Sequence, residues 1–163
     1  MMFELDISSL SAIIAAIGVM IGVVLTVLEV RNWVNTRQTD LVIRLYSTFG
    51  SDEIQEAWER IQTREFKDFD SYRKEYGLQD VNKVGWFFEG LGVLLRRKLI
   101  DISLVDDLFS SPVKRAWEKL LPVAEGERNQ TNRPQIWEWF EYVYNEMKKR
   151  EQKLQQSKVW FKT

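Results

Sequence analysis

The side chain best suited to chemistry is Glu89, which lies inside the aromatic and apolar stretch WFFEGLG at residues 86–92. A buried carboxylate must be paired, hydrogen-bonded or protonated, because an isolated buried charge is costly. Two interpretations stay open. Glu89 is either a proton- or ligand-binding acid, or half of a structural ion pair with an arginine such as Arg44, Arg96 or Arg128. We favour the ion pair.

The chain contains no cysteine and no histidine. This composition excludes disulfides, thiolate nucleophiles and cysteine-ligated zinc, and it removes the usual general base and the commonest nitrogen ligand of transition metals. The carboxylate pairs Asp68/Asp70 and Asp106/Asp107 lack a metal-loop pattern, so we interpret them as turn or capping residues. We expect no catalytic residue, no metal site and no cofactor, and therefore no enzyme.

Residues 10–28, LSAIIAAIGVMIGVVLTVL, carry no charged side chain. As a helix this segment is about 28 Å long, close to the hydrocarbon thickness of a bilayer. It predicts a single transmembrane helix over residues 10–30. The acidic leader at residues 1–9 does not suit a cleavable signal peptide. The alternative is a buried core helix of a soluble protein.

The flanking charges predict the orientation of this helix. No lysine or arginine precedes it, whereas Arg31, Arg37 and Arg44 follow it. The positive-inside rule then puts residues 1–9 outside the cell membrane and the rest of the chain in the cytoplasm. Trp33 falls where an indole can lie at the level of the lipid headgroups.

One face of the predicted transmembrane helix carries small and polar side chains. They recur every three or four residues: Ser11, Ala15, Gly18, Gly22, Thr26 and Glu29. Gly18 and Gly22 form a GxxxG pair, which lets two helices approach closely in lipid. We favour a packing interface with a second helix. Chance spacing and a pore lining with Glu29 at its cytoplasmic mouth remain alternatives.

The rest of the chain is predicted to be helical. A juxtamembrane helix is expected over residues 31–50 and a helical cytoplasmic domain over residues 51–147. Its most apolar helix, at residues 80–100, is expected to be central to the domain. Glycines at 85, 90 and 92 suggest close approach of a neighbouring helix there. Ser111-Pro112 predicts a helix start, Pro122 a helix end, residues 124–133 an exposed loop, and Pro134 the start of the last helix. The fold class is all-α: one N-terminal transmembrane helix followed by a helical bundle.

The C-terminal tail, residues 148–163, combines basic and aromatic side chains. They are Lys148, Lys149, Arg150, Lys153, Lys158, Trp160, Phe161 and Lys162. Such a mixture suits an anionic membrane surface, and it equally suits a solvated helix end. The net charge of −1 for the whole chain argues against a nucleic-acid partner.

The arrangement over residues 40–146 resembles a family of uncharacterised bacterial and archaeal proteins that is known only as a domain of unknown function. The residues that carry the resemblance are Trp86-Phe87-Phe88-Glu89-Gly90-Leu91-Gly92, Leu99-Ile100-Asp101, Ala116-Trp117 and Trp139-Phe140-Glu141. The resemblance implies one N-terminal transmembrane helix and a small helical domain. It implies no activity.

These observations favour a membrane-anchored helical interaction module. We expect it to self-associate as a homo-oligomer or to serve as an accessory subunit of a membrane complex, with membrane lipid as its other partner. The alternative function is a homo-oligomeric channel or pore-forming effector.

Overall fold

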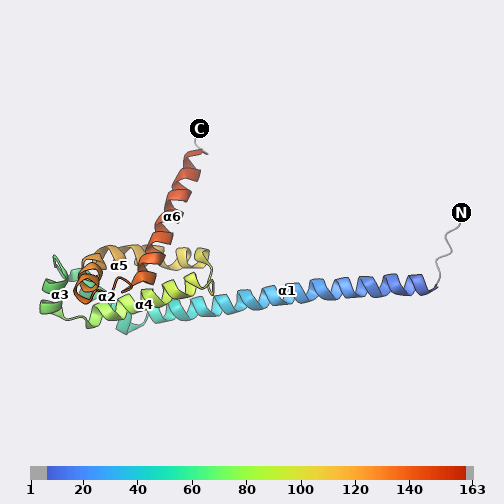
Figure 1. Cartoon of the computed structure of the whole chain (residues 1–163), viewed down its shortest axis with the longest axis horizontal. Coiled ribbons are helices and arrows are strands. Elements are labelled where there is room, and N and C mark those ends of the chain that lie inside the picture. The colour runs from blue at the N-terminus through green and yellow to red at the C-terminus, as the bar shows by residue number, and fades with distance from the viewer. Residues whose placement is uncertain (1–6, 161–163) are drawn as a thin grey trace. The chain divides into compact units, whose positions relative to one another are not determined.

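The computed structural model describes the backbone of residues 7–160 and the side chains of residues 10–156. Within this part the chain is all-helical and contains no strand (Figure 1). Its helices are α1 (Ile7–Phe49), α2 (Asp52–Thr63), α3 (Phe69–Tyr76), α4 (Gln79–Arg96), α5 (Ile102–Thr131) and α6 (Glu138–Trp160). The chain divides into two compact units, and the boundary along the sequence falls between Asp40 and Leu41. This boundary falls inside the juxtamembrane helix predicted from the sequence.

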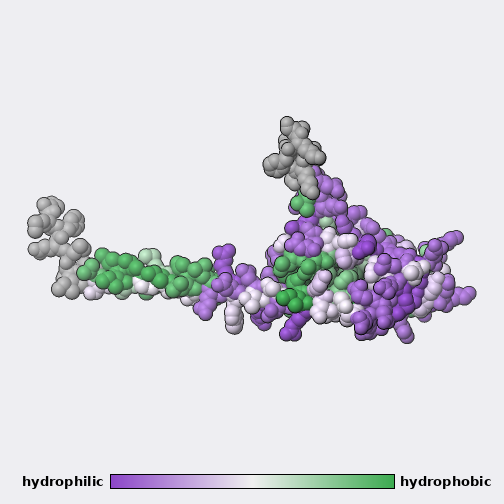
Figure 2. Space-filling view, turned by 180° about the vertical axis from the view of Figure 1, so that it is seen from behind, coloured by the Kyte–Doolittle hydropathy of each residue, from purple (hydrophilic) through white to green (hydrophobic). Residues whose placement is uncertain are grey.

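The first unit is the part of α1 that precedes Leu41. An 18-residue window of this helix has a mean hydropathy of 2.6 and none of it is buried, so α1 is long and apolar enough to cross a membrane. Figure 2 shows its apolar side chains as a continuous green surface that gives way to hydrophilic side chains. Thr26 fits this apolar stretch because its hydroxyl donates to the Gly22 carbonyl oxygen at 2.8 Å.

The second unit, which we call the helical domain, contains residues 41–49 of α1 and helices α2 to α6. Each helix buries one apolar stripe; on α2 this stripe is Ile54, Ala57, Trp58 and Ile61. Helix α4 contacts α2, α5 and α6, which confirms the prediction that the most apolar helix is central. The Phe88 ring of α4 stacks on the Phe140 ring of α6, with centroids 4.7 Å apart.

The sequence-based boundaries around α5 are wrong. Pro112 and Pro122 neither start nor end a helix, because α5 runs through both of them to Thr131. The buried side chains on either side of the prolines keep one helical spacing, and this packing outweighs the lost hydrogen bonds. The segment at 124–133, expected to be an exposed loop, is therefore helical up to Thr131. Asn132, in the left-handed conformation with φ 52°, ends the helix.

Candidate functional site

Helix α4 presents Gly85, Glu89 and Gly92 on one face, since they are spaced by four and three residues. A Cβ atom on Gly85 would lie 2.6 Å from Cζ2 of Trp137, and one on Gly92 would overlap the Trp139 carbonyl. The two glycines therefore let the start of α6 lie directly against α4. This confirms the predicted close approach at two glycines, whereas Gly90 has no neighbour within 4 Å.

Glu89 lies between these glycines and caps α6. Its Oε2 atom accepts hydrogen bonds from the backbone nitrogens of Trp139 at 3.1 Å and Phe140 at 2.9 Å. These N–H groups lie in the first turn of α6, where no intrahelical acceptor exists. Glu89 makes no ion pair within the part of the chain that the structure describes. The ion pair that we favoured from the sequence is therefore wrong.

Arg128, one of the arginines proposed to pair with Glu89, instead binds the segment that leads into α6. Its Nε donates to the Ile136 carbonyl oxygen at 2.8 Å, and its Nη1 lies 2.8 Å from Glu141 Oε2. Its guanidinium also lies 5.7 Å from the centroid of the Trp117 ring. Nη2 is buried without a hydrogen-bond partner. Arg128 thus fixes the turn from which Trp137 and Trp139 reach α4.

Burial raises the pKa of Glu89 above the ordinary glutamate value, against the two backbone hydrogen bonds, which lower it. The carboxylate lines a hollow of about 380 Å³ together with Glu127, Arg133 and the exposed Trp86. Burial raises the pKa of Glu127 as well. Among the described residues no cluster of acids could hold a metal ion.

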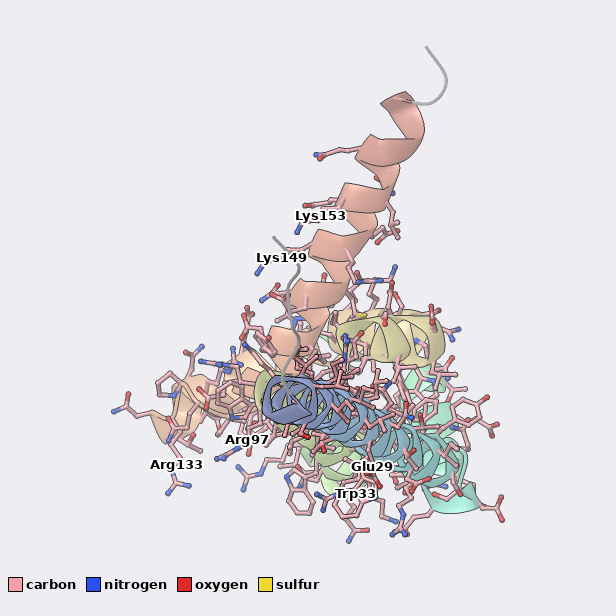
Figure 3. The ribbon with its side chains drawn as sticks, turned by 90° about the vertical axis from the view of Figure 1, so that its right-hand side faces the viewer. Glu29, Trp33, Arg97, Arg133, Lys149 and Lys153 are labelled. Atoms are coloured by element: carbon pink, nitrogen blue, oxygen red, sulfur yellow. The ribbon has the colours of Figure 1, made fainter. Side chains whose placement is uncertain are left out.

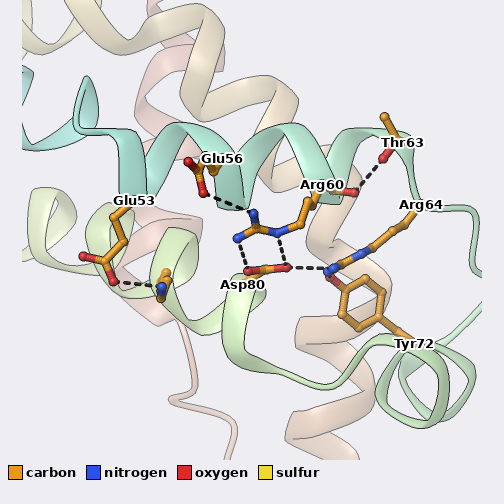
Figure 4. Close-up of polar contacts among 8 residues, drawn as sticks. Glu53, Glu56, Arg60, Thr63, Arg64, Tyr72 and Asp80 are labelled. Atoms are coloured by element: carbon orange, nitrogen blue, oxygen red, sulfur yellow. Dashed lines mark hydrogen bonds and ion pairs between the residues drawn. The ribbon is translucent and has the colours of Figure 1, made fainter.

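A polar network that the sequence did not reveal joins α2, α3 and α4 (Figure 4). Arg60 donates to both carboxylate oxygens of Asp80, at 3.0 and 2.9 Å. Arg64 Nη2 lies 2.7 Å from Asp80 Oδ2, and Arg64 Nη1 donates to the Tyr72 hydroxyl at 2.7 Å. The hydrogen bond from Arg60 lowers the pKa of Asp80. Asp80 and Arg60 are twenty residues apart, so no local spacing pattern indicates this pairing.

The small-residue stripe of α1 is exposed in the first unit. All six predicted members lie on the apolar helix: Ser11, Ala15, Gly18, Gly22, Thr26 and Glu29. A Cβ atom on Gly18 or Gly22 would meet nothing within 4 Å. Trp33, the predicted interface residue, is 74% exposed (Figure 3).

The basic residues of the predicted tail make different contacts. Arg150 pairs with Asp106 of α5 at 2.9 Å, and Lys149 pairs with Glu146 at 2.7 Å. Lys148 lies 5.2 Å from the centroid of the Tyr144 ring. Lys149 and Lys153 project from the same side of α6 in Figure 3. The side chains of Lys158, Trp160, Phe161 and Lys162 lie outside the described residues.

Comparison with known proteins gives a family but no activity. The family model described as a domain of unknown function, DUF4760, matches residues 13–147. No curated protein and no solved structure matches the chain. The matched range takes in most of the apolar part of α1, the Glu89 cap and the first turns of α6. The chain therefore belongs to the DUF4760 family.

Proposed function

We propose that this protein is a membrane-anchored helical module that associates with other transmembrane helices, either copies of itself or a further subunit of a membrane complex. The observation that supports this function is a contrast between two groups of glycines. Gly85, Gly92 and Gly126 are each covered by a neighbouring side chain or backbone segment, whereas Gly18, Gly22 and Gly90 have nothing within 4 Å. Of these three open glycines, Gly18 and Gly22 lie on an exposed apolar helix. A second helix would cover them as closely as α6 covers Gly92.

The proposal places α1 across the cell membrane of a bacterium or archaeon. Residues 1–9 lie outside and the helical domain lies in the cytoplasm, as the arginines after the apolar segment favour. In this arrangement the helical domain is a binding module and not an enzyme. Its lack of cysteine and histidine supports this assignment.

A pore lined by the same stripe is the competing function. Residues 10–28 contain no charge, and the Thr26 hydroxyl is already bonded to the Gly22 carbonyl oxygen, so the stripe offers few free polar groups to a lumen. Glu29 is the one acid on the stripe. Packing accounts for both glycines, whereas a pore requires neither.

Association of the full chain in a mild non-ionic detergent tests the proposal. The variant Gly18→Leu/Gly22→Leu fills the open face and is expected to weaken self-association or partner recovery at least about tenfold. The matched control is Met20→Leu/Val24→Leu, which changes residues about 160° away around the same helix. The control should keep the mass of the wild-type assembly, measured by light scattering. Equal assembly of both variants contradicts the proposal, and ion conductance that Glu29→Gln alters favours the pore.

A further inference from the structure

The corner between α4 and α5 has an unusual backbone. Lys98 lies in the left-handed region with φ 57°. Its N–H donates to the Leu95 carbonyl oxygen and the Leu99 N–H donates to the Leu94 carbonyl oxygen, both at 2.9 Å. This hydrogen-bond pattern is a Schellman motif, in which glycine is the favoured residue at the position of Lys98. A lysine there keeps a charged side chain at the corner at a cost in backbone free energy.

The corner carries three consecutive exposed cations, Arg96, Arg97 and Lys98. Within the described part of the chain no carboxylate pairs with any of them, whereas Arg60 and Arg64 both pair with Asp80. Arg97 projects from the surface of the helical domain in Figure 3. Three consecutive cations without an ion pair therefore give this corner a local positive charge.

An apolar side chain follows the cations directly. In a Schellman motif the residue at the position of Leu99 usually packs against the helix it follows, yet Leu99 is 46% exposed. The next residue, Ile100, is buried and holds the corner to the core. Leu108 is also exposed, and Figure 2 shows apolar side chains gathered at the end of the helical domain where α4 meets α5.

A hollow of about 410 Å³ lies beside the cations. It is lined by Val93, Arg96, Arg97 and Trp139, and so combines two guanidinium groups with apolar walls. Guanidinium groups bind phosphate oxygens in a bidentate geometry, and an indole suits the boundary between headgroups and acyl chains. The combination fits the phosphate of a lipid headgroup.

We infer that the corner formed by Arg96, Arg97, Lys98 and Leu99 docks the helical domain on anionic lipid headgroups, with Leu99 inserted into the interface. This inference rests on the membrane anchoring in the proposed function, but not on self-association. Only the twelve residues 29–40 connect the apolar segment to the helical domain. A domain on so short a tether stays beside the bilayer, where anionic lipid attracts cations and the interface accepts a leucine.

The test uses the full chain in nanodiscs of phosphatidylcholine, with or without phosphatidylglycerol at about 30%. Because the chain has no cysteine, Leu99→Cys can carry a single nitroxide. Its collisions with oxygen and with a water-soluble nickel chelate report its depth. We expect the label to be in lipid in the anionic discs and in water in the neutral discs or at high salt. The control label Glu125→Cys, about 35 Å along α5 from the corner, should stay in water throughout.

Removing the charge separates docking from folding. Arg96→Gln/Arg97→Gln/Lys98→Gly is expected to lower the docking equilibrium constant roughly a hundredfold, about fivefold for each cation. Lys98→Gly alone should weaken docking about fivefold while the Tm of the helical domain stays equal or rises, since glycine suits the left-handed position. A loss of Tm with no change in docking assigns Lys98 a structural role and overturns the inference.

The remaining outcomes are distinguishable from a failure of the proposed function. A chain that does not enter nanodiscs refutes the anchoring itself. A chain that enters them but keeps the Leu99 label in water refutes only the docking. A label shielded from both oxygen and nickel lies in a protein contact. A label equally deep in neutral and anionic discs shows that docking does not depend on lipid charge. Both of these results also overturn the inference.

Discussion

Glu89 of α4 and Phe140 of α6 are joined by a hydrogen bond of 2.9 Å from the Phe140 backbone nitrogen to Glu89 Oε2. The same oxygen accepts the Trp139 N–H. One carboxylate therefore satisfies two of the N–H groups that the first turn of α6 cannot pair internally. Its negative charge also complements the positive end of the helix dipole. The acid of the WFFEGLG stretch thus serves to position α6.

Glu89→Leu should destabilise the helical domain by about 1–3 kcal/mol, because it leaves two half-buried N–H groups without an acceptor. Glu89→Gln keeps a carbonyl oxygen at the same place and should lose less. Urea unfolding of the full chain in non-ionic micelles, followed by tryptophan fluorescence, measures both values. Equal stability of wild type and the leucine variant would show that the cap contributes nothing.

The raised pKa of Glu89 predicts how this stability changes with pH. Burial raises the folded-state pKa above the unfolded value, so ionisation of Glu89 costs folding free energy. This cost is absent below the unfolded pKa and is complete once pH has risen through the folded pKa. Wild type should therefore gain stability relative to Glu89→Gln as pH falls from neutral to below the ordinary glutamate pKa. The other carboxylates titrate in both proteins and cancel. A difference that stays constant or shrinks with acidification contradicts this prediction.

Two glycines of α4 form a matched pair for testing the contact with α6. Gly92→Ala places a Cβ against the Trp139 carbonyl and should cost at least about 1–3 kcal/mol, because backbone atoms cannot move aside easily. Gly90 lies two residues earlier on an open face, so Gly90→Ala should stabilise the helix by about 1 kcal/mol. Thermal unfolding monitored by circular dichroism distinguishes the two signs. Similar effects of both substitutions would indicate that α6 does not lie against Gly92.

The features predicted correctly from the sequence depend on periodicity within one helix. The apolar length of α1 and the central place of α4 belong to this class, because helical spacing sets which side chains are buried. The continuity of α5 is not predicted, because Pro112 and Pro122 each indicate a helix boundary when only the neighbouring residues are considered. The apolar stripe of α5, however, continues through Pro112 and Pro122.

The side-chain partners of Glu89 and Asp80 could not be predicted for a different reason. Glu89 accepts hydrogen bonds from the backbone N–H groups of Trp139 and Phe140. Because nearly every residue has a backbone N–H group, the residue types in the sequence do not indicate which ones will bind Glu89. Asp80 meets Arg60 and Arg64 only after α2 and α4 have packed together. Both pairings form only when the helices pack in the tertiary structure. The sequence shows which side chains are charged, but not which of them will lie close together.

Asp80→Asn should destabilise the helical domain by about 2 kcal/mol at neutral pH, because it leaves Arg64, whose side chain is 15% exposed, without its carboxylate. The hydrogen bond from Arg60 lowers the folded-state pKa of Asp80, so its contribution is present above the unfolded pKa and is lost as pH falls through the folded value. Urea unfolding should show the gap between wild type and variant closing in acid. Glu56→Gln, at a carboxylate that is 66% exposed, should change little at any pH. If the difference in unfolding free energy between wild type and Asp80→Asn persists after Asp80 is protonated, the destabilisation comes from packing and not from charge.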